Sequence, residues 1–416
     1  MELPVHSGLD GGQRPRAHVV FLPPRVAELN NPAPKLPPGL LRVMLGTTLV
    51  VLSYSLLNPV LAVRLQTAGA SSTAIGLFAM LPFISVAMLV PLVPRLFARI
   101  GVGQAYRAGL LLELISCLGY LLTADYRIWC ALGLMAGMGA AAAWNATEAL
   151  IAHNVPASHR GRLTGMYQAL LGAGMALGPM LPGLLRIGPT EANAIAAGGL
   201  ALGLLITLVP AVTQLKAMHD DHEPMSLMSA WRFRPALAWA AVVGGVFEVG
   251  LGSITTAYGS QIGMNLAAAT SIAGALGMGS FLFQYPTGWL ADHMPARRLF
   301  ALGAGVLVIS AVAFVQATTW PTLIWICAAA WGGIGGALYT LSMIRVAHDF
   351  ADSSALAGTS AMIAGYTAGG ALGPLISGWV FDHFGVGGQG SWLAVLALSL
   401  LLMQTRADGS QPRATN

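Results

Sequence analysis

Charged side chains are the first shortage in this chain. Lys, Arg, Asp and Glu make up 9% of its 416 residues, whereas a soluble domain carries about 25%. Apolar residues take their place, because hydrophobic side chains reach 56% and the mean hydropathy is +0.69. This balance excludes an ordinary soluble domain and indicates a protein embedded in a lipid bilayer.

Cysteine and the common catalytic motifs are also scarce. Cys117, Cys130 and Cys327 each lie in an apolar stretch, and none has a neighbour at a metal-ligand or redox spacing. The chain holds no Gly-rich loop ending in Gly-Lys-Ser/Thr, no His-Glu-x-x-His and no Ser/His/Asp set. We therefore expect no enzyme, no ATP-driven pump, no cofactor and no metal. The acidic run at 219–223 fits a solvated linker better than a metal site.

Residues 1–38 contain no short apolar core before a small-residue cleavage site, so we expect that they are not a signal peptide. These residues are rich in Pro, Gly and Arg, which predicts a disordered cytoplasmic tail. We expect residues 405–416 to form a second cytoplasmic tail. No nucleic-acid motif is present, and cytoplasmic loops facing anionic lipid account for the net charge of +5.

Apolar sequence fills the rest of the chain. An apolar run of about 20 residues crosses the hydrocarbon core as a helix. Such runs lie at residues 40–62, 72–94, 104–123, 127–150, 163–185, 193–212, 236–258, 267–290, 298–317, 321–344, 355–379 and 389–404. The predicted fold class is an all-α integral membrane protein with twelve transmembrane helices.

Basic residues divide unevenly between the two sets of loops. With the N-terminus in the cytoplasm, only Arg64, Arg127 and Arg186 of the 21 Lys and Arg residues fall on the outer side. The positive-inside rule therefore predicts a multi-pass protein of a bacterial inner membrane with both termini in the cytoplasm. A wrong number of spans would place Lys and Arg residues on both sides of the membrane, so the pattern supports an even number of spans.

A polar linker at 213–235 divides the chain into an N-terminal half, 39–212, and a C-terminal half, 236–404. Two short segments recur 195 residues later: Ala176-Leu-Gly-Pro179 as Ala371-Leu-Gly-Pro374, and Ala152-His153 as Ala347-His348. Repeated halves related by an axis along the membrane normal are a known transporter plan. We predict two pseudo-symmetric six-helix halves.

The loop after the eighth span carries a family resemblance. The run Gly288-Trp-Leu-Ala-Asp292-His-Met-Pro-Ala-Arg297-Arg298 resembles the G-x-x-x-D-R-x-G-R-R loop of the major facilitator superfamily. Its small residue allows close helix approach, and its Asp can accept hydrogen bonds from a helix N-terminus. The resemblance implies a latch that joins the two halves in one state of the transport cycle. The first-half loop keeps Arg99 and Gly101, but Ala98 stands where the family has Asp.

Span five resembles the antiporter motif of drug:proton exporters in that superfamily, and span eleven holds a shorter version. The matching residues are Gly165, Gly174, Gly178, Pro179 and Gly183 in span five, and Gly369, Gly373, Pro374 and Gly378 in span eleven. Pro182 replaces one Gly of the motif. The resemblance implies proton-linked export, and ordinary small-residue packing between helices is the alternative.

Three acidic residues, Glu113, Glu148 and Glu248, fall well inside the predicted spans. A charged side chain there costs at least about 2.5 kcal/mol, so such residues usually face a cavity and mark a substrate or proton path. Glu248 is the foremost candidate for proton coupling or for pairing with a cationic substrate, because span seven lines the central cavity in the superfamily. The resemblance makes the span of Glu113 peripheral. Glu248 could instead make a structural hydrogen bond to a neighbouring span, and Glu148 could pair with Arg162 or Arg345.

Polar and aromatic residues within the spans complete the candidate cavity. They are Tyr54, Asn58, Asn145, Gln168, Gln284, Tyr339 and Tyr366. Each could instead bond between helices or anchor at the membrane interface. No Arg or Lys lies in the middle of a span, which disfavours phosphorylated or dicarboxylate cargo. We expect a cationic, zwitterionic or neutral small molecule.

The segments Trp144–Glu148 and Gln284–Asp292 further resemble the bacterial YcaD-like branch of the superfamily, and the resemblance as a whole covers residues 40–404. It implies the major facilitator fold and a secondary active transporter that works by alternating access. We predict a monomer whose partners are a small-molecule substrate, protons and the lipid bilayer, and whose activity is proton-coupled export. The alternatives are proton-coupled uptake of a small nutrient and a non-transporting, transporter-like membrane sensor.

Overall fold

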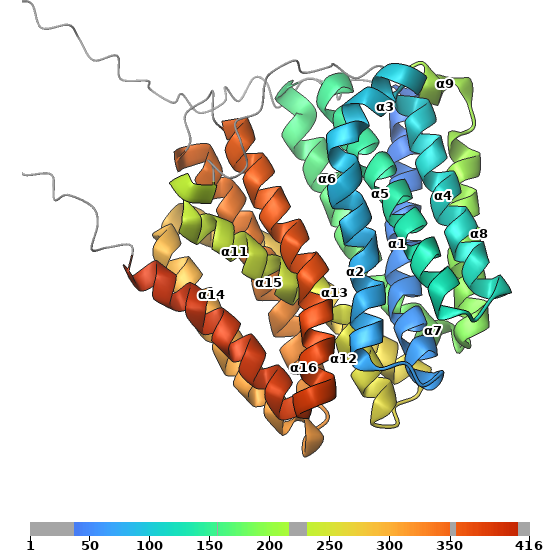
Figure 1. Cartoon of the computed structure of the whole chain (residues 1–416). Coiled ribbons are helices and arrows are strands. Elements are labelled where there is room, and N and C mark those ends of the chain that lie inside the picture. Colours follow the sequence, from blue (N-terminus) through green and yellow to red (C-terminus); the bar gives the residue numbers. More distant parts are fainter. Residues whose placement is uncertain (1–36, 156, 216–230, 350–354, 407–416) are drawn as a thin grey trace, which may run out of the picture. The chain divides into compact units, whose positions relative to one another are not determined.

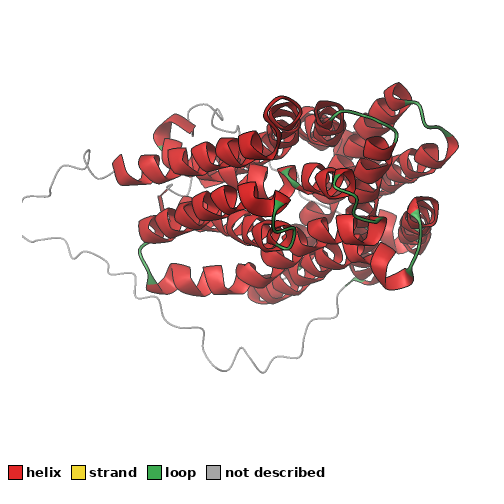
Figure 2. Ribbon diagram, turned by 90° about the horizontal axis from the view of Figure 1, so that it is seen from below, coloured by secondary structure: helices red, strands yellow, loops and turns green. Residues whose placement is uncertain are grey.

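The computed structural model describes residues 37–155, 157–215, 231–349 and 355–406 (Figure 1). Within these ranges the chain is almost entirely helical and contains no strand (Figure 2). Backbone amides in a bilayer core must be satisfied inside their own segment, which is why apolar runs of this length fold as helices. The expectations for the two tails and for the acidic run at 219–223 lie almost wholly outside the described residues.

Six long helices and several short segments form the first part of the chain. They are α1 (Pro38–Thr67), α2 (Ser72–Leu89), η2 (Val90–Leu92), α3 (Val93–Ile100), α4 (Val102–Leu122), α5 (Tyr126–Asn154), α6 (Ala157–Leu177), η3 (Gly178–Met180), α7 (Leu181–Leu185), α8 (Pro189–Thr207) and α9 (Pro210–Thr213). Side chains cap two helix starts here. Ser71 accepts a hydrogen bond from the amide of Ala74, and Asp125 accepts from the amide of Ile128.

The second part of the chain repeats this plan. Its elements are α11 (Pro235–Gly245), η4 (Val246–Gly250), α12 (Gly252–Gln261), α13 (Leu266–His293), α14 (Ala296–Phe314), η5 (Val315–Thr318), α15 (Leu323–Asp349) and α16 (Ala355–Arg406). The last stretch that could span a membrane, Gly358–Gln404, has 47 residues. About 20 residues suffice for one crossing, so this stretch is long enough for two.

Gly385 divides α16 into two helices. Its φ of 61° and ψ of −156° are not helical, and a residue without a Cβ adopts such a conformation at little cost. The loop that the sequence predicts between the last two spans is therefore a sharp bend. Counting both parts of α16, the described residues contain twelve membrane-crossing segments, in agreement with the predicted fold class.

The helix contacts show two related halves and the surfaces that join them. α2 packs on α5 in the first half as α13 packs on α15 in the second, and the pair α4 and α5 corresponds to α14 and α15. Between the halves, α2 packs on α16, α6 on α13, and α1 on α12. This is the two-fold plan of the major facilitator fold. The exact linker boundaries stay a prediction.

Small residues allow the halves to meet closely. A Cβ at Gly378 of α16 would overlap the carbonyl group of Ser72, and a Cβ at Gly76 of α2 would overlap that of Pro374. On the other interface, a Cβ at Gly277 of α13 would lie 2.6 Å from the carbonyl oxygen of Met175. Glycine is thus required where backbones touch across the halves.

Candidate functional site

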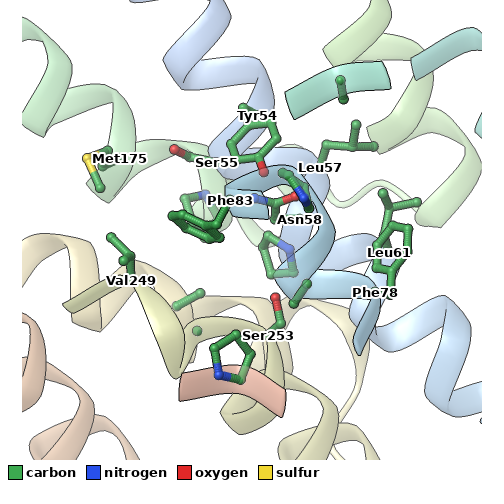
Figure 3. A pocket seen from close by; sticks show the side chains of 18 of the residues that line it. Tyr54, Ser55, Leu57, Asn58, Leu61, Phe78, Phe83, Met175, Val249 and Ser253 are labelled. Atoms are coloured by element: carbon green, nitrogen blue, oxygen red, sulfur yellow. The ribbon is translucent and has the colours of Figure 1, made fainter. Parts of the chain in front are cut away.

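A cavity of about 170 Å³ lies between the two halves. Helices α1, α2, α4, α5, α6 and α8 and the short segment η3 supply one side of its wall, and η4, α12, α13 and α16 supply the other. Figure 3 shows Tyr54 and Asn58 of α1 on one side and Val249 and Ser253 on the other. Among the described residues that line it, most are apolar, two are Glu, and none is Arg, Lys or His.

Glu248 lies in η4, a π-helical segment between α11 and α12. Such wide turns inside a membrane helix occur often at functional sites. The side chain is only 6% exposed, lines the cavity and has both oxygens satisfied. The Ser280 hydroxyl donates to Oε1 at 2.5 Å, and the Tyr366 hydroxyl donates to Oε2 at 2.9 Å. The three side chains form a polar cluster joining η4 to α13 and α16.

Glu113 lies in α4 and lines the same cavity from the first half. It is 4% exposed, and its Oε1 atom has no hydrogen-bond partner in the described part of the chain. Gly139 of α5 makes room for it, because a Cβ there would lie 2.9 Å from the Glu113 Cγ atom. The resemblance implied a peripheral position, but the structure places this carboxyl at the cavity.

Glu148, the third acid, does not line this cavity. Its Oε1 atom accepts a hydrogen bond of 2.7 Å from the indole of Trp144, four residues earlier on α5. Arg162, one of its two expected partners, has no described side chain. Glu148 thus stays a candidate proton or substrate residue, at a position on α5 outside this cavity.

The polar residues expected in the cavity fall into two groups. Tyr54 and Asn58 line it, and Tyr366 reaches it through Glu248. The others do not line it. Asn145 donates a hydrogen bond to the Ala141 carbonyl, and Gln284 accepts one from Thr340. Gln168 is exposed, and the centroid of the Tyr339 ring lies 4.5 Å from that of the Tyr366 ring.

The loop motif of the family is mostly exposed in this structure. Asp292 is exposed and makes no hydrogen bond within the described residues, and Arg298 is also exposed. Arg297 donates from Nε to the Gln404 carbonyl at 2.7 Å, which joins α14 to the end of α16. In the first-half loop Arg99 is exposed, and Gly101, with φ 83°, forms the bend between α3 and α4.

The small residues of the antiporter-like motif lie against α1 and the cavity. A Cβ at Gly178 would lie 2.7 Å from the Leu52 carbonyl oxygen, and Gly174 also faces Leu52. Helix α6 ends before Gly178, and Pro179 of η3 lines the cavity. In the second half, Gly373 packs against Val246, and Pro374 lines the cavity.

Asp382 is a functional candidate that the sequence analysis missed. Its carboxylate accepts hydrogen bonds from the Ser72 amide at 2.8 Å, from the Thr73 amide at 2.7 Å and from the Thr73 hydroxyl at 2.6 Å. It therefore caps α2 of the first half from α16 of the second. The signal was present, because the Gly-Trp-x-x-Asp-His sequence of residues 288–293 recurs at 378–383.

Comparisons with curated proteins agree with the fold. The MFS-type transporter YfkF of Bacillus subtilis (strain 168) is 25% identical over 340 residues, which cover 80% of this chain and 86% of that protein. The MFS-type transporter YcaD of Escherichia coli (strain K12 / DH10B) is 24% identical over 376 residues, 88% of this chain and 95% of that one. Both relatives are named as uncharacterized transporters.

Solved structures share the architecture at low sequence identity. The nucleoside transporter NupG superposes with a TM-score of 0.70 at 10% identity and covers 90% of this chain and 100% of its own. A D-xylose-proton symporter gives 0.68 at 15% identity, with 87% and 96% covered. The family model of the Major Facilitator Superfamily matches residues 43–355 and 250–404. The chain therefore belongs to the Major Facilitator Superfamily of membrane transporters, and it resembles the YcaD-like relatives as its motifs predicted.

Proposed function

We propose that this transporter exports a small cationic or zwitterionic molecule with an apolar part, in exchange for protons. The cavity between the halves is the substrate site. The two halves rock about it and open it to one side of the membrane at a time. We place the protein in a bacterial inner membrane as a monomer with both termini in the cytoplasm, as the distribution of Lys and Arg favours.

The observation that carries the proposal is Glu248 in its cavity. This carboxyl is buried at the meeting point of the halves, and the described lining offers no basic side chain to pair with it. A cationic group on the substrate would supply the missing charge. The apolar wall, which includes Phe78 and Phe83, suits the rest of such a molecule.

Export as the direction rests on the antiporter-like motif of α6. Its Gly174 and Gly178 face α1, and its Pro179 borders the cavity, so this stretch connects the cavity to the packing of the first half. Uptake is the second candidate, because a solved structure with the same fold is a D-xylose-proton symporter. A membrane sensor without flux is the third.

Transport by proteoliposomes under an imposed pH gradient tests the proposal. A thermal-shift screen of the purified protein with cationic drugs, amino acids, sugars and organic acids first supplies a substrate. We expect a cation to stabilise the wild type, and to cross the membrane in the direction opposite to the proton flow. Movement in the same direction as the protons would establish uptake instead, and binding without flux would favour a sensor.

Glu248→Gln is the decisive variant, since it removes the charge and keeps the shape. We expect it to lose at least about 90% of proton-coupled transport, because a removed charge-assisted contact is worth about 1.5–3 kcal/mol. Glu191→Gln, at an exposed acid in the first turn of α8, is the matched control and should transport normally. Full coupled transport by Glu248→Gln would refute the assignment.

A further inference from the structure

Glu113 is a buried acid to which the proposed mechanism assigns no role. It lines the cavity from α4, and Glu248 lines it from η4. A charged carboxylate in this cavity is costly, because water is largely excluded and the described lining holds no basic partner, and two such charges are costlier still. We therefore expect the two carboxyls to hold at least one proton when no substrate is bound.

The hydrogen bonds around the two carboxyls differ. Glu248 receives a hydroxyl donor on each oxygen, from Ser280 and from Tyr366, and such donors stabilise a carboxylate anion. Glu113 has an Oε1 atom without any partner among the described residues. An unpartnered buried charge costs several kcal/mol, so the proton belongs on Glu113.

The neighbours of Glu113 do not supply a compensating charge. Tyr54 of α1 and Cys117 and Tyr120 of α4 are the titratable groups that line the cavity beside it, and phenols and thiols are neutral near pH 7. The elements packed on α4 bring uncharged residues to this region, Gly139 from α5 and Leu200 from α8.

We propose that Glu113 carries the proton which a cationic substrate displaces, while Glu248 stays charged and holds the positive group. This inference rests on the proposed function and divides its two tasks between two residues. When a monocation enters, the O–H bond of Glu113 breaks and the proton leaves to water. The positive charge of the substrate replaces that of the proton, so the net charge of the cavity is unchanged.

Calorimetric titration with benzyltrimethylammonium tests the division. This probe has an aromatic ring for the apolar wall and a fixed charge without a titratable proton. Repeating the titration in buffers of different ionisation enthalpy counts the protons released. We expect the wild type to release about one proton, and its affinity to rise about tenfold per pH unit while Glu113 is protonated.

The variants Glu113→Gln and Glu248→Gln should separate proton release from cation binding. Glu113→Gln should still bind the probe, but without proton release and without pH dependence. Glu248→Gln should lose affinity at least about tenfold, and Glu191→Gln should match the wild type. Proton release that survives in Glu113→Gln and disappears in Glu248→Gln would overturn the inference and leave the proposed function intact. A wild type that binds neither the probe nor any cation of the screen would overturn both.

A labelling experiment on the wild type avoids any effect of substitution on folding. Dicyclohexylcarbodiimide adds to protonated carboxyls in apolar surroundings. We expect it to modify Glu113, as read by peptide mass spectrometry, and the probe to protect that residue. Modification of Glu248 with Glu113 untouched would contradict the proposal.

Discussion

The hexapeptide Gly-Trp-x-x-Asp-His occurs at the end of α13, residues 288–293, and again in α16, residues 378–383. The two copies have the same local structure. Their Trp and His ring centroids lie 4.3 Å and 4.6 Å apart, and His Nδ1 is 2.7 Å and 2.8 Å from the Trp carbonyl oxygen. Residues four apart share one face of a helix, so this geometry is local in origin.

The surroundings of the two copies differ. Asp382 caps the start of α2 through three hydrogen bonds, whereas Asp292 is exposed and has no hydrogen bond in the described residues. Gly378 touches the Ser72 backbone, but a Cβ at Gly288 would meet no atom within 4 Å. The same six-residue pattern therefore joins the halves in α16, whereas in α13 it forms an exposed helix end without such contacts.

This difference indicates that the cavity is held shut at the end where α1 ends and α2 begins. Around Asp382, α16 joins α2, and nearby the Ser260 hydroxyl of α12 donates to the Gln66 side chain of α1 at 2.9 Å. Alternating access as proposed requires these contacts to break in the opposite state. Substitutions at equivalent positions of the two copies can therefore separate local effects from those of the joint.

Gly378→Ala should have the largest effect. The new methyl group would overlap the Ser72 carbonyl, and a backbone group cannot rotate away. We expect a loss of about 3 kcal/mol in unfolding free energy, measured by denaturation in detergent. Gly288→Ala is the matched control, since its methyl group enters open space. Equal stabilities of the two variants would show that the joint is not tightly packed.

Asp382→Ala should come next. It leaves two amides and a hydroxyl at the start of α2 without their acceptor. We expect a cost of about 1–2 kcal/mol, as for the loss of a helix N-cap, and faster hydrogen exchange of the Ser72 and Thr73 amides. Unchanged exchange at these amides would contradict a capping role for Asp382.

Thr73→Val should have a smaller effect, because it removes one of the three donors and keeps both amides. The hydrogen bond from its hydroxyl to Asp382 Oδ2 is 2.6 Å long, and its loss should cost about 1 kcal/mol. Thr67→Val serves as control, since that hydroxyl bonds only within its own helix. A larger loss in the control would mean that Thr73 contributes little to the joint.

Asp292→Asn should have the smallest effect on stability, within about 0.5 kcal/mol, because the side chain is exposed. The family resemblance implies that this residue acts in another state of the cycle. Transport in proteoliposomes should therefore fall although the denaturation midpoint stays the same. A variant with normal transport would remove Asp292 from the set of functional residues.

Several of these features follow from the sequence because they are local. Hydropathy placed the membrane helices, and the Gly288–Arg298 loop and the small residues around Gly178 identified the superfamily before any contact was known. Glu113 and Glu248 stood out because acids are rare within apolar spans. The end of α6 before Gly178 and Pro179 is local as well, since Pro has no amide hydrogen to continue a helix.

Other features depend on residues distant in the chain. The sequence marked Glu113 as a candidate and the family resemblance made its span peripheral, yet helix packing brings it to the cavity that Glu248 lines from the other half. The hydroxyls of Ser280 and Tyr366, 32 and 118 residues after Glu248, determine which carboxyl has donors. The bond between Asp382 and Thr73 spans 309 residues.

The sequence by itself thus determined the membrane class, the helices and the superfamily, because a bilayer imposes length, apolarity and internal hydrogen bonding on each segment separately. Only the tertiary structure decided which carboxyls share a cavity, which of them is left without a donor, and which copy of the hexapeptide joins the halves. Hydrogen bonds act over about 3 Å, so their partners are set by how the helices pack and not by their order along the chain.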